Sequence, residues 1–186
     1  PGLLITLVVT AFNALGDVYP YLEQHDTIRI SAEANYTPAA ADTFPGSISV
    51  TIIGGYISNF TTHAPFLNAT GFDGTNLSSS STFLRLDSMS TVEGLYFTNF
   101  AGTCIDVNGA HEVAINGNRF SYCGTAVKIT QSSNIQLKNN LFSFGTRGVY
   151  LNSVSTDFVL IENNTFAQNS SDGIYDVHSQ ILLKNN

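Results

Sequence analysis

The chain has 186 residues, of which 7 are basic and 14 acidic, giving a formal net charge of −7 at pH 7. This length is typical of one domain, and the acidic balance, without a cluster of Lys and Arg, argues against nucleic acid or an anionic membrane as a partner. Charged residues make up 11% of the chain, against roughly 25% in average soluble domains, and Asn, Ser, Thr and Gly take the polar positions, which is typical of a secreted or cell-surface β protein.

The chain opens with an apolar segment, GLLITLVV, at residues 2–9. The segment is too short to span a bilayer and lacks the basic flank of an intact signal peptide, so we expect a buried or edge strand and no transmembrane segment. The chain begins at Pro1 without a methionine, so processing or truncation upstream stays open. Residues 10–81 show no clear period, and we expect N-terminal strands and irregular coils over residues 1–81.

Short apolar alternations recur from residue 82 onwards. They are FLRL (83–86), CIDV (104–107), AVKI (126–129), GVYL (148–151) and GIYDV (173–177), spaced 21 or 22 residues apart until an insertion near residues 152–172 stretches one step to 25. Alternate residues of a strand face opposite sides. One set should therefore point inward: Leu84 and Leu86, Ile105 and Val107, Val127 and Ile129, Val149 and Leu151. The other set should form an outward column: Arg85, Asp106, Lys128, Tyr150 and Tyr175.

A second repeat combines a short apolar alternation with asparagine. Its copies are VAINGNRF (113–120), IQLKNNLF (135–142), VLIENNTF (159–166) and ILLKNN (181–186). Their second asparagine position falls, in steps of 22, 24 and 22 residues, at Asn118, Asn140, Asn164 and Asn186. A fixed period of about 20 to 30 residues built from strands is the signature of a solenoid. We predict an all-β parallel β-helix, a single domain over residues 1–186, with coils of about 21–25 residues that each contribute two short strands and a turn.

The repeated asparagine should mark a corner in the regular coils of residues 82–186. Asparagine tolerates left-handed backbone angles, and its amide can bond to the same group one coil above and below, so these four residues should form a ladder. We expect an internal column of stacked phenylalanines beside it, formed by Phe100, Phe120, Phe142 and Phe166.

Two cysteines, Cys104 and Cys123, lie 19 positions apart, slightly less than one coil. A turn between them could bring the sulfurs within bridging range, and an intrachain disulfide, free buried thiols and an intermolecular bridge all stay open. With no nearby histidine pair they do not suggest a metal site, and we expect no metal or cofactor. Six Asn-X-Ser/Thr triplets would accept glycans in a suitable host, at Asn35, Asn59, Asn68, Asn76, Asn163 and Asn169.

Four segments resemble the N-terminal coils of secreted bacterial right-handed β-helix proteins of the pectin-lyase-like superfamily. They are DTIRISAEANYTP (26–38), SISVTIIGGYISNFTTHAP (47–65), GFDGTN (71–76) and TVEGLYFTNF (91–100). In that group a Tyr-Thr-Pro-like turn, here residues 36–38, precedes a Gly-Gly-Tyr turn, here residues 54–56, and a strand like residues 94–99 opens the regular coils. The resemblance spans about residues 26–186 and implies a right-handed helix. It does not fix a function, because the superfamily includes polysaccharide lyases, glycoside hydrolases, tailspikes, adhesins and passive surface proteins.

The outward side chains argue against catalysis. A pectate-lyase-like site needs carboxylates on adjacent coils to hold calcium, together with a basic residue. The column that begins at Arg85 alternates in sign instead, as does a second outward column, formed by Asn116, Lys138, Glu162 and Lys184. The closest acid pair for glycoside hydrolysis is Asp172 and Asp176, with His178, and turn or edge polarity accounts for it. We therefore lean against an enzyme and name no catalytic residue.

Our first functional hypothesis is a non-enzymatic structural or self-assembling surface protein, such as a filament, sheath or adhesin-stalk subunit. Leu160 and Leu182 form a small apolar step on one outward face, and the chain stops in mid-repeat at Asn186. Self-association could use open solenoid ends or the N-terminal strand. The alternative is a carbohydrate-binding or carbohydrate-processing β-helix, in which Tyr150 and Tyr175, beside Lys128, would stack on sugar rings.

Overall fold

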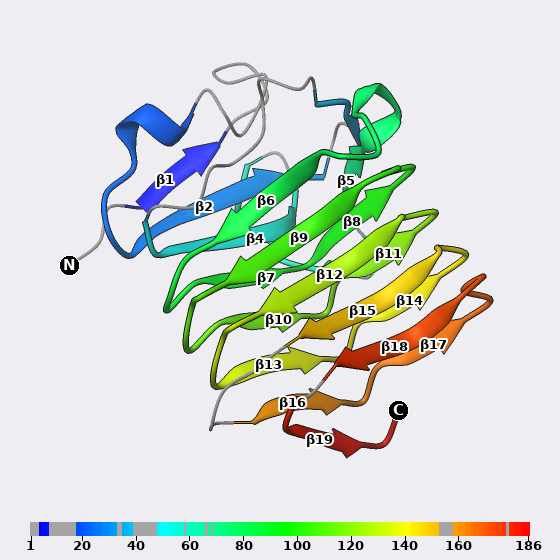
Figure 1. The fold of residues 1–186 in the computed structure, drawn as a ribbon. Helices are drawn as coiled ribbons and strands as arrows, with labels where there is room; N and C mark the ends of the chain where they lie inside the picture. The colour runs from blue at the N-terminus through cyan, green and yellow to red at the C-terminus, as the bar shows by residue number, and fades with distance from the viewer. Residues whose placement is uncertain are drawn as a thin grey trace.

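The computed structural model describes residues 18–32, 35–38, 48–57, 59–65, 67, 69–152, 158–177 and 179–186, together with the backbone of residues 4–7. Within these ranges three parallel sheets, called A, B and C here, run along a solenoid whose colour passes from blue at one end to red at the other (Figure 1). Sheet A contains β1 (Leu4–Leu7), β2 (Asp26–Ser31), β4 (Val50–Tyr56), β7 (Thr91–Glu93), β10 (Ala114–Asn116), β13 (Ile135–Lys138), β16 (Val159–Glu162) and β19 (Ile181–Lys184). Sheet B contains β3 (Asn35–Tyr36), β5 (Thr70–Asp73), β8 (Leu95–Thr98), β11 (Arg119–Ser121), β14 (Leu141–Ser143) and β17 (Thr165–Ala167). Sheet C contains β6 (Thr82–Leu86), β9 (Thr103–Asn108), β12 (Thr125–Thr130), β15 (Arg147–Asn152) and β18 (Asp172–Val177).

Each regular coil contributes three strands, so the expectation of two strands per coil was wrong. The segment at residues 113–120, predicted as one strand and a corner, divides into β10 on sheet A and β11 on sheet B. Helical structure within the described residues comprises two single 3-10 turns, η1 (Tyr19–Tyr21) and η3 (Gly74–Asn76). The described part of the N-terminal apolar segment, β1, pairs in parallel with β2 and lies at the edge of sheet A, as predicted. Residues 2, 3, 8 and 9 lie outside the described residues.

The predicted inward positions of sheet C are confirmed. Leu84, Ile105, Val127 and Val149 follow one another in register, and so do Leu86, Val107, Ile129 and Leu151. All eight are buried. Sheet A supplies the facing wall, with a buried aliphatic residue at each level: Ile28, Ile52, Val92, Ile115, Leu137 and Ile161.

The aromatic column on sheet B is real, but Phe97, not Phe100, is the member that precedes Phe120. The rings of Phe97 and Phe120 are parallel with centroids 5.0 Å apart, and the stack continues through Phe142 at 5.0 Å to Phe166 at 4.9 Å. Phe100 is also buried, yet it meets Phe97 edge to face at 6.1 Å. Strand β8 pairs Phe97 directly with Phe120, which places Phe100 beyond the strand.

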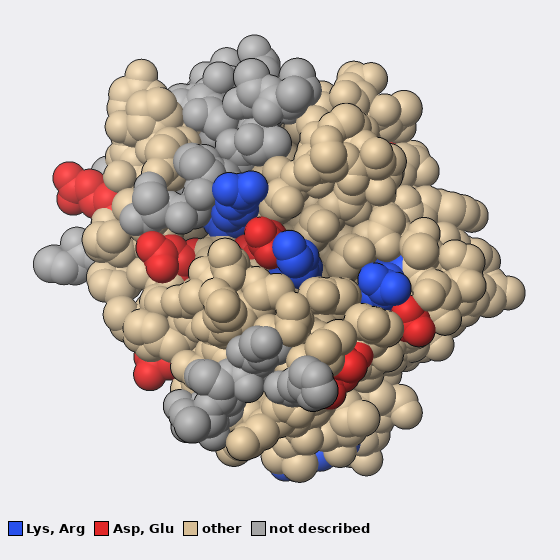
Figure 2. Space-filling view, viewed as in Figure 1, with Lys and Arg blue, Asp and Glu red and all other residues tan. Residues whose placement is uncertain are grey.

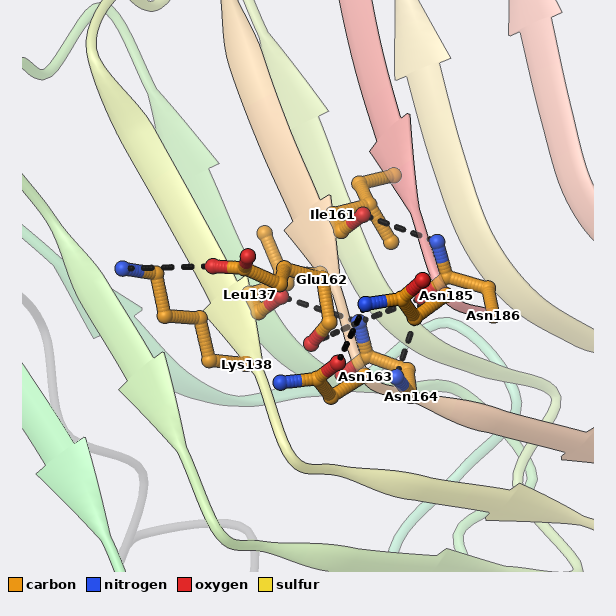
Figure 3. Close-up of polar contacts among 8 residues, drawn as sticks. All are labelled: Leu137, Lys138, Ile161, Glu162, Asn163, Asn164, Asn185 and Asn186. Atoms are coloured by element: carbon orange, nitrogen blue, oxygen red, sulfur yellow. Dashed lines mark hydrogen bonds and ion pairs between the residues drawn. The ribbon is translucent and has the colours of Figure 1, made fainter.

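The asparagine ladder is confirmed, with Asn118, Asn140 and Asn164 buried and Asn186 exposed. Asn140 Oδ1 accepts from the Asn118 amide at 2.9 Å and from Asn118 Nδ2 at 3.3 Å, and the same pattern joins Asn140 to Asn164 and Asn164 to Asn186. The Nδ2 atom of each rung also donates to a strand carbonyl of the preceding coil, as Asn164 Nδ2 does to Leu137 O at 2.9 Å (Figure 3). The ladder therefore satisfies backbone and side-chain groups that would otherwise be buried without partners.

The left-handed backbone falls one residue before the ladder. Asn139, Asn163 and Asn185 have φ of 56°, 56° and 51°, and Gly117 takes the same place at 63°. Two adjacent residues thus divide the roles that the sequence pattern had assigned to one: the first turns the chain and the second carries the amide ladder. Leu95 holds the ladder position in the coil before Asn118, where its backbone amide donates to Asn118 Oδ1 at 3.0 Å.

Cys104 and Cys123 meet inside the core with their Sγ atoms 2.8 Å apart, and both are free thiols. The predicted proximity is confirmed, whereas the disulfide itself stays a prediction. Burial is the main cause that raises the pKa of Cys104 well above the ordinary thiol value, and the neighbouring Cys123 thiol acts in the same direction. The fold therefore favours the neutral thiol.

Replacing Asn140 with leucine tests the ladder. Asn140→Leu removes the acceptor of the Asn118 amide and the donor to Ile115 O, both buried, so the free energy of unfolding should fall by about 1–3 kcal/mol. The matched control is Asn139→Gly, which changes the exposed turn residue at φ 56° and should be neutral, because glycine adopts this angle freely. Denaturant titration measures both, and an unchanged midpoint for Asn140→Leu would contradict the ladder's energetic role.

The raised pKa of the Cys104 thiol predicts an alkaline loss of stability. A folded-state pKa above the unfolded one gives stability that is fully present below the unfolded thiol pKa, about 8.5, and is lost as pH rises towards the folded pKa. Under a phosphine reductant, the free energy of unfolding should therefore decline between about pH 8 and 9.5, and this slope should be smaller for the variant Cys104→Ala/Cys123→Ala. The pH range ends at about 9.5 because burial also raises the pKa of Tyr36. At higher pH this tyrosine should also lower the free energy of unfolding. Equal slopes for both proteins would show that Cys104 does not contribute to this pH dependence.

Candidate functional site

The predicted outward column of sheet C exists. Its five members occupy one register position on successive strands from β6 to β18: Arg85, Asp106, Lys128, Tyr150 and Tyr175. Arg85 and Tyr175 are exposed and the other three are partly buried. Basic and acidic side chains lie close to one another on the face shown in Figure 2, and neither sign gathers into a large patch. The face as a whole therefore offers no strong electrostatic field for a ligand of one sign.

Asp106 has an unsatisfied carboxylate oxygen in this column. Its Oδ1 atom is buried and has no hydrogen-bond partner, although Arg85 and Lys128 occupy the neighbouring coils. The ion pairs found among the described residues lie elsewhere, between Lys138 and Glu162 at 3.7 Å and between Arg147 and Asp172 at 2.9 Å. Burial keeps this oxygen out of reach of a ligand on the surface of sheet C.

The predicted tyrosine pair is stacked, and an arginine that sequence reasoning missed covers it. Tyr150 and Tyr175 have ring centroids 5.5 Å apart at 16°. The Arg147 guanidinium lies 4.5 Å from the Tyr175 centroid and 5.7 Å from that of Tyr150. Arg147 Nε also donates to Asp172 Oδ2. The pKa of Asp172 is lowered mainly by the hydrogen bond from the Ser171 hydroxyl and, after it, by the hydrogen bond from Arg147. This cluster satisfies itself through cation–π and ion-pair contacts, which leaves less ring surface for a ligand.

The acid pair considered for hydrolysis does not form a matched site. Asp172 is engaged by Arg147, whereas Asp176 takes the register position of the inward Leu151. The strand pairing from Tyr150 to Asn152 continues without a register shift, and Asp176 is exposed on the last described strand of sheet C. His178 lies outside the described residues. No group of three or more His, Cys, Asp or Glu in the described ranges could hold a metal ion.

The residues proposed for assembly lie together on the outer face of sheet A. Leu160 and Leu182 are partners on β16 and β19, and Leu182 is 38% exposed. The second outward column runs beside them in register through Asn116, Lys138, Glu162 and Lys184. The result is a short apolar step next to a row of alternating charges.

The glycan acceptor triplets differ in accessibility. Asn35, Asn59, Asn76 and Asn163 are exposed, and Asn68 lies outside the described residues. Asn169 is partly buried, its Oδ1 accepts from the Gly145 amide at 3.1 Å, and its Nδ2 donates to Phe142 O at 3.2 Å. Glycosylation at Asn169 would disturb a bond between coils, so the exposed acceptors stay the better predictions.

The most exposed stacked aromatic pair was missed by sequence reasoning. Tyr122 and Phe144, on the turns from sheet B to sheet C, are 57% and 48% exposed, and their rings stack at 5.4 Å and 17°. They border a hollow of about 310 Å³ that Thr146 and Ser170 also line. The available signal was positional: each aromatic residue stands two residues after a phenylalanine of the inward column.

Comparisons with known proteins agree with this geometry. Residues 46–186 match the sequence model of the family described as the right handed beta helix region. No curated protein and no solved structure matches the chain. Within the described residues, no helix has both the length and the apolar character needed to cross a membrane. Since the family match covers most of the chain and the strands stack as parallel sheets, this protein belongs to the right-handed β-helix family.

Proposed function

We propose that the chain is a non-enzymatic structural module of an extracellular or cell-surface protein, a rigid β-helix rod that associates with other copies through its side. The main support for the proposal is that the same hydrogen bonds and ring contacts repeat from coil to coil along the solenoid axis. The amide ladder from Asn118 to Asn186 and the ring stack from Phe97 to Phe166 run in parallel through the regular coils. Repeated nearest-neighbour contacts of this kind make a solenoid behave as one stiff element.

The surface composition supports an extracellular location. Charged residues make up only 11% of the chain, and several glycan acceptor asparagines are exposed. A weakly charged surface rich in hydroxyl and amide groups suits a protein that is secreted, where glycosylation can occur.

The side of sheet A offers a surface for association. Leu160 and Leu182 form the apolar step, and the alternating charges of Lys138, Glu162 and Lys184 lie beside it. A second copy could bury the leucines while its own row of charges sets the register. The described edge strand β1 offers a further route, the addition of a strand to sheet A.

Replacing the two leucines of the apolar step with charged residues tests lateral association. In the variant Leu160→Lys/Leu182→Glu the new charges face each other in register, so the fold should persist while self-association weakens by at least about tenfold through lost apolar burial. The matched control, Thr82→Lys/Thr103→Glu, places the same charges at paired positions of sheet C and should associate like the wild type. Sedimentation velocity over a concentration series, with negative-stain electron microscopy, measures the effect. A wild type that stays monomeric, or a variant that assembles equally well, would contradict lateral association.

Carbohydrate binding on sheet C is a second candidate, favoured by the stacked tyrosines. Tyr150 and Tyr175 lie on the outward column that also contains the carboxylate of Asp106. Two cations, Arg85 and Lys128, flank this single carboxylate, so the column favours a glycan that carries acidic groups.

The variant Tyr150→Ala/Tyr175→Ala tests this candidate. It should weaken binding of hexagalacturonate, measured by isothermal titration calorimetry, by about tenfold, because stacking on the two rings is lost. Tyr96→Ala, at a partly buried position of sheet B, is the control and should bind like the wild type. If the wild type gives no binding heat with hexagalacturonate, sheet C does not hold an acidic glycan.

A further inference from the structure

The turns from sheet B to sheet C place unusual side chains on left-handed backbone. The equivalent residues of four successive coils are Asn99, Tyr122, Phe144 and Gln168, with φ of 59°, 55°, 55° and 54°. Asparagine tolerates this conformation, whereas a bulky aromatic residue there is strained by about 1–2 kcal/mol. The backbone of this turn therefore gives no reason to prefer an aromatic side chain.

Packing does not explain the aromatic residues either. Tyr122 and Phe144 stack on each other, yet about half of each side chain stays exposed, while the inward phenylalanines of the same coils, Phe120 and Phe142, are fully buried. No cationic group of the described residues lies over either ring, in contrast with Arg147 over Tyr175. Strained and exposed aromatic side chains that the fold does not need are a recurrent feature of binding sites.

The rings border a hollow with room for a small ligand. Its volume is about 310 Å³. Gly124 and Gly145 also line the hollow, and a Cβ atom at Gly145 would approach Cys123 O of the preceding coil to 2.6 Å, so the stacking of the coils requires glycine there. The exposed residues Thr146 and Ser170 place hydroxyl-bearing side chains at its border. This combination of an aromatic face and hydroxyl groups matches a pyranose ring, which has an apolar C–H face and a polar edge.

Charge distinguishes the class of sugar. None of the residues that line the hollow is charged. A uronic acid would find no cation there to pair with its carboxylate, whereas a neutral hexose needs none.

We propose that the hollow beside Tyr122 and Phe144 binds one ring of a neutral saccharide, with the ring face on the aromatic pair and its hydroxyls near Thr146 and Ser170. The site goes beyond the structural role proposed above, because it would give the rod a fixed point of contact with a polysaccharide. It is also separate from the tyrosine column of sheet C, which favours acidic glycans.

The test uses a variant in which binding and stability should respond in opposite ways. Tyr122→Asn/Phe144→Asn introduces the residue that Asn99 already provides at this turn position, so the melting temperature should stay the same or rise. The probes are cellohexaose, laminarihexaose and mannohexaose, with hexagalacturonate as the acidic comparison, and isothermal titration calorimetry reports binding. The wild type should bind at least one neutral probe, the double variant should lose at least about tenfold in affinity for that probe, and any binding of hexagalacturonate should be the same in both proteins.

The matched control is Tyr96→Ala, which removes an aromatic side chain at a partly buried position of sheet B that does not line the hollow and should bind the neutral probe like the wild type. Absence of wild-type binding to all three neutral probes would overturn the proposal, as would neutral binding that survives in Tyr122→Asn/Phe144→Asn. A melting temperature that falls by several degrees in the asparagine variant, with no change in binding, would show instead that the aromatic pair is a structural clamp. The Leu160→Lys/Leu182→Glu variant should bind the neutral probe normally, so failure of lateral association and failure of this site can be told apart.

Discussion

The amide ladder fixes the register in which each regular coil stacks on the next. Each rung from Asn118 to Asn164 uses its backbone amide, its Nδ2 and its Oδ1 in bonds to neighbouring coils, within a region where water cannot replace a lost partner. A slip of one residue would leave several of these groups unpaired and would turn every inward side chain outwards. The aliphatic columns and the ring stack then follow from the ladder, because equal positions of successive coils must superimpose.

This register also determines what the surface can offer. Outward residues one coil apart lie about 4.8 Å from each other, so side chains of neighbouring coils interact before they meet any ligand. Lys138 pairs with Glu162, Arg147 pairs with Asp172, and the tyrosines of β15 and β18 stack on each other. Much of the charge and aromatic area visible in the sequence is therefore already used within the solenoid. The rings of Tyr122 and Phe144 also stack on each other, yet about half of each residue stays exposed, so they keep surface that a ligand can reach.

The sequence predicted what a period of 21 to 25 residues can specify. Inward pairs such as Ile105 and Val107, the rungs of the ladder and the column from Arg85 to Tyr175 all repeat at this spacing, and all appear in the structure. Errors arose where a coil departs from the consensus. The coil containing Phe97 has Gly94 and Leu95 where later coils have an asparagine ladder residue, so alignment on asparagine selected Phe100 instead. The third strand of each coil was missed because three residues, such as 119–121, are too few to show an alternation.

The Tyr122 position shows why the turn was harder to read than the strands. Its importance depends on the backbone angle, which apolar alternation does not reveal, and its exposure depends on the turn pointing away from the core. In a repetitive fold, equivalent positions of neighbouring coils can be compared directly. Asn99 and Gln168 occupy the same left-handed turn position in the coils on either side of the aromatic pair. At Tyr122 and Phe144 local backbone preference and burial both disfavour the residue present, since bulky aromatic side chains lie on left-handed backbone and about half of each residue is exposed. Since sequences that fold well are consistent across these levels, the two aromatic residues are best explained by a constraint that acts from outside the fold, which is the physical argument for a ligand there.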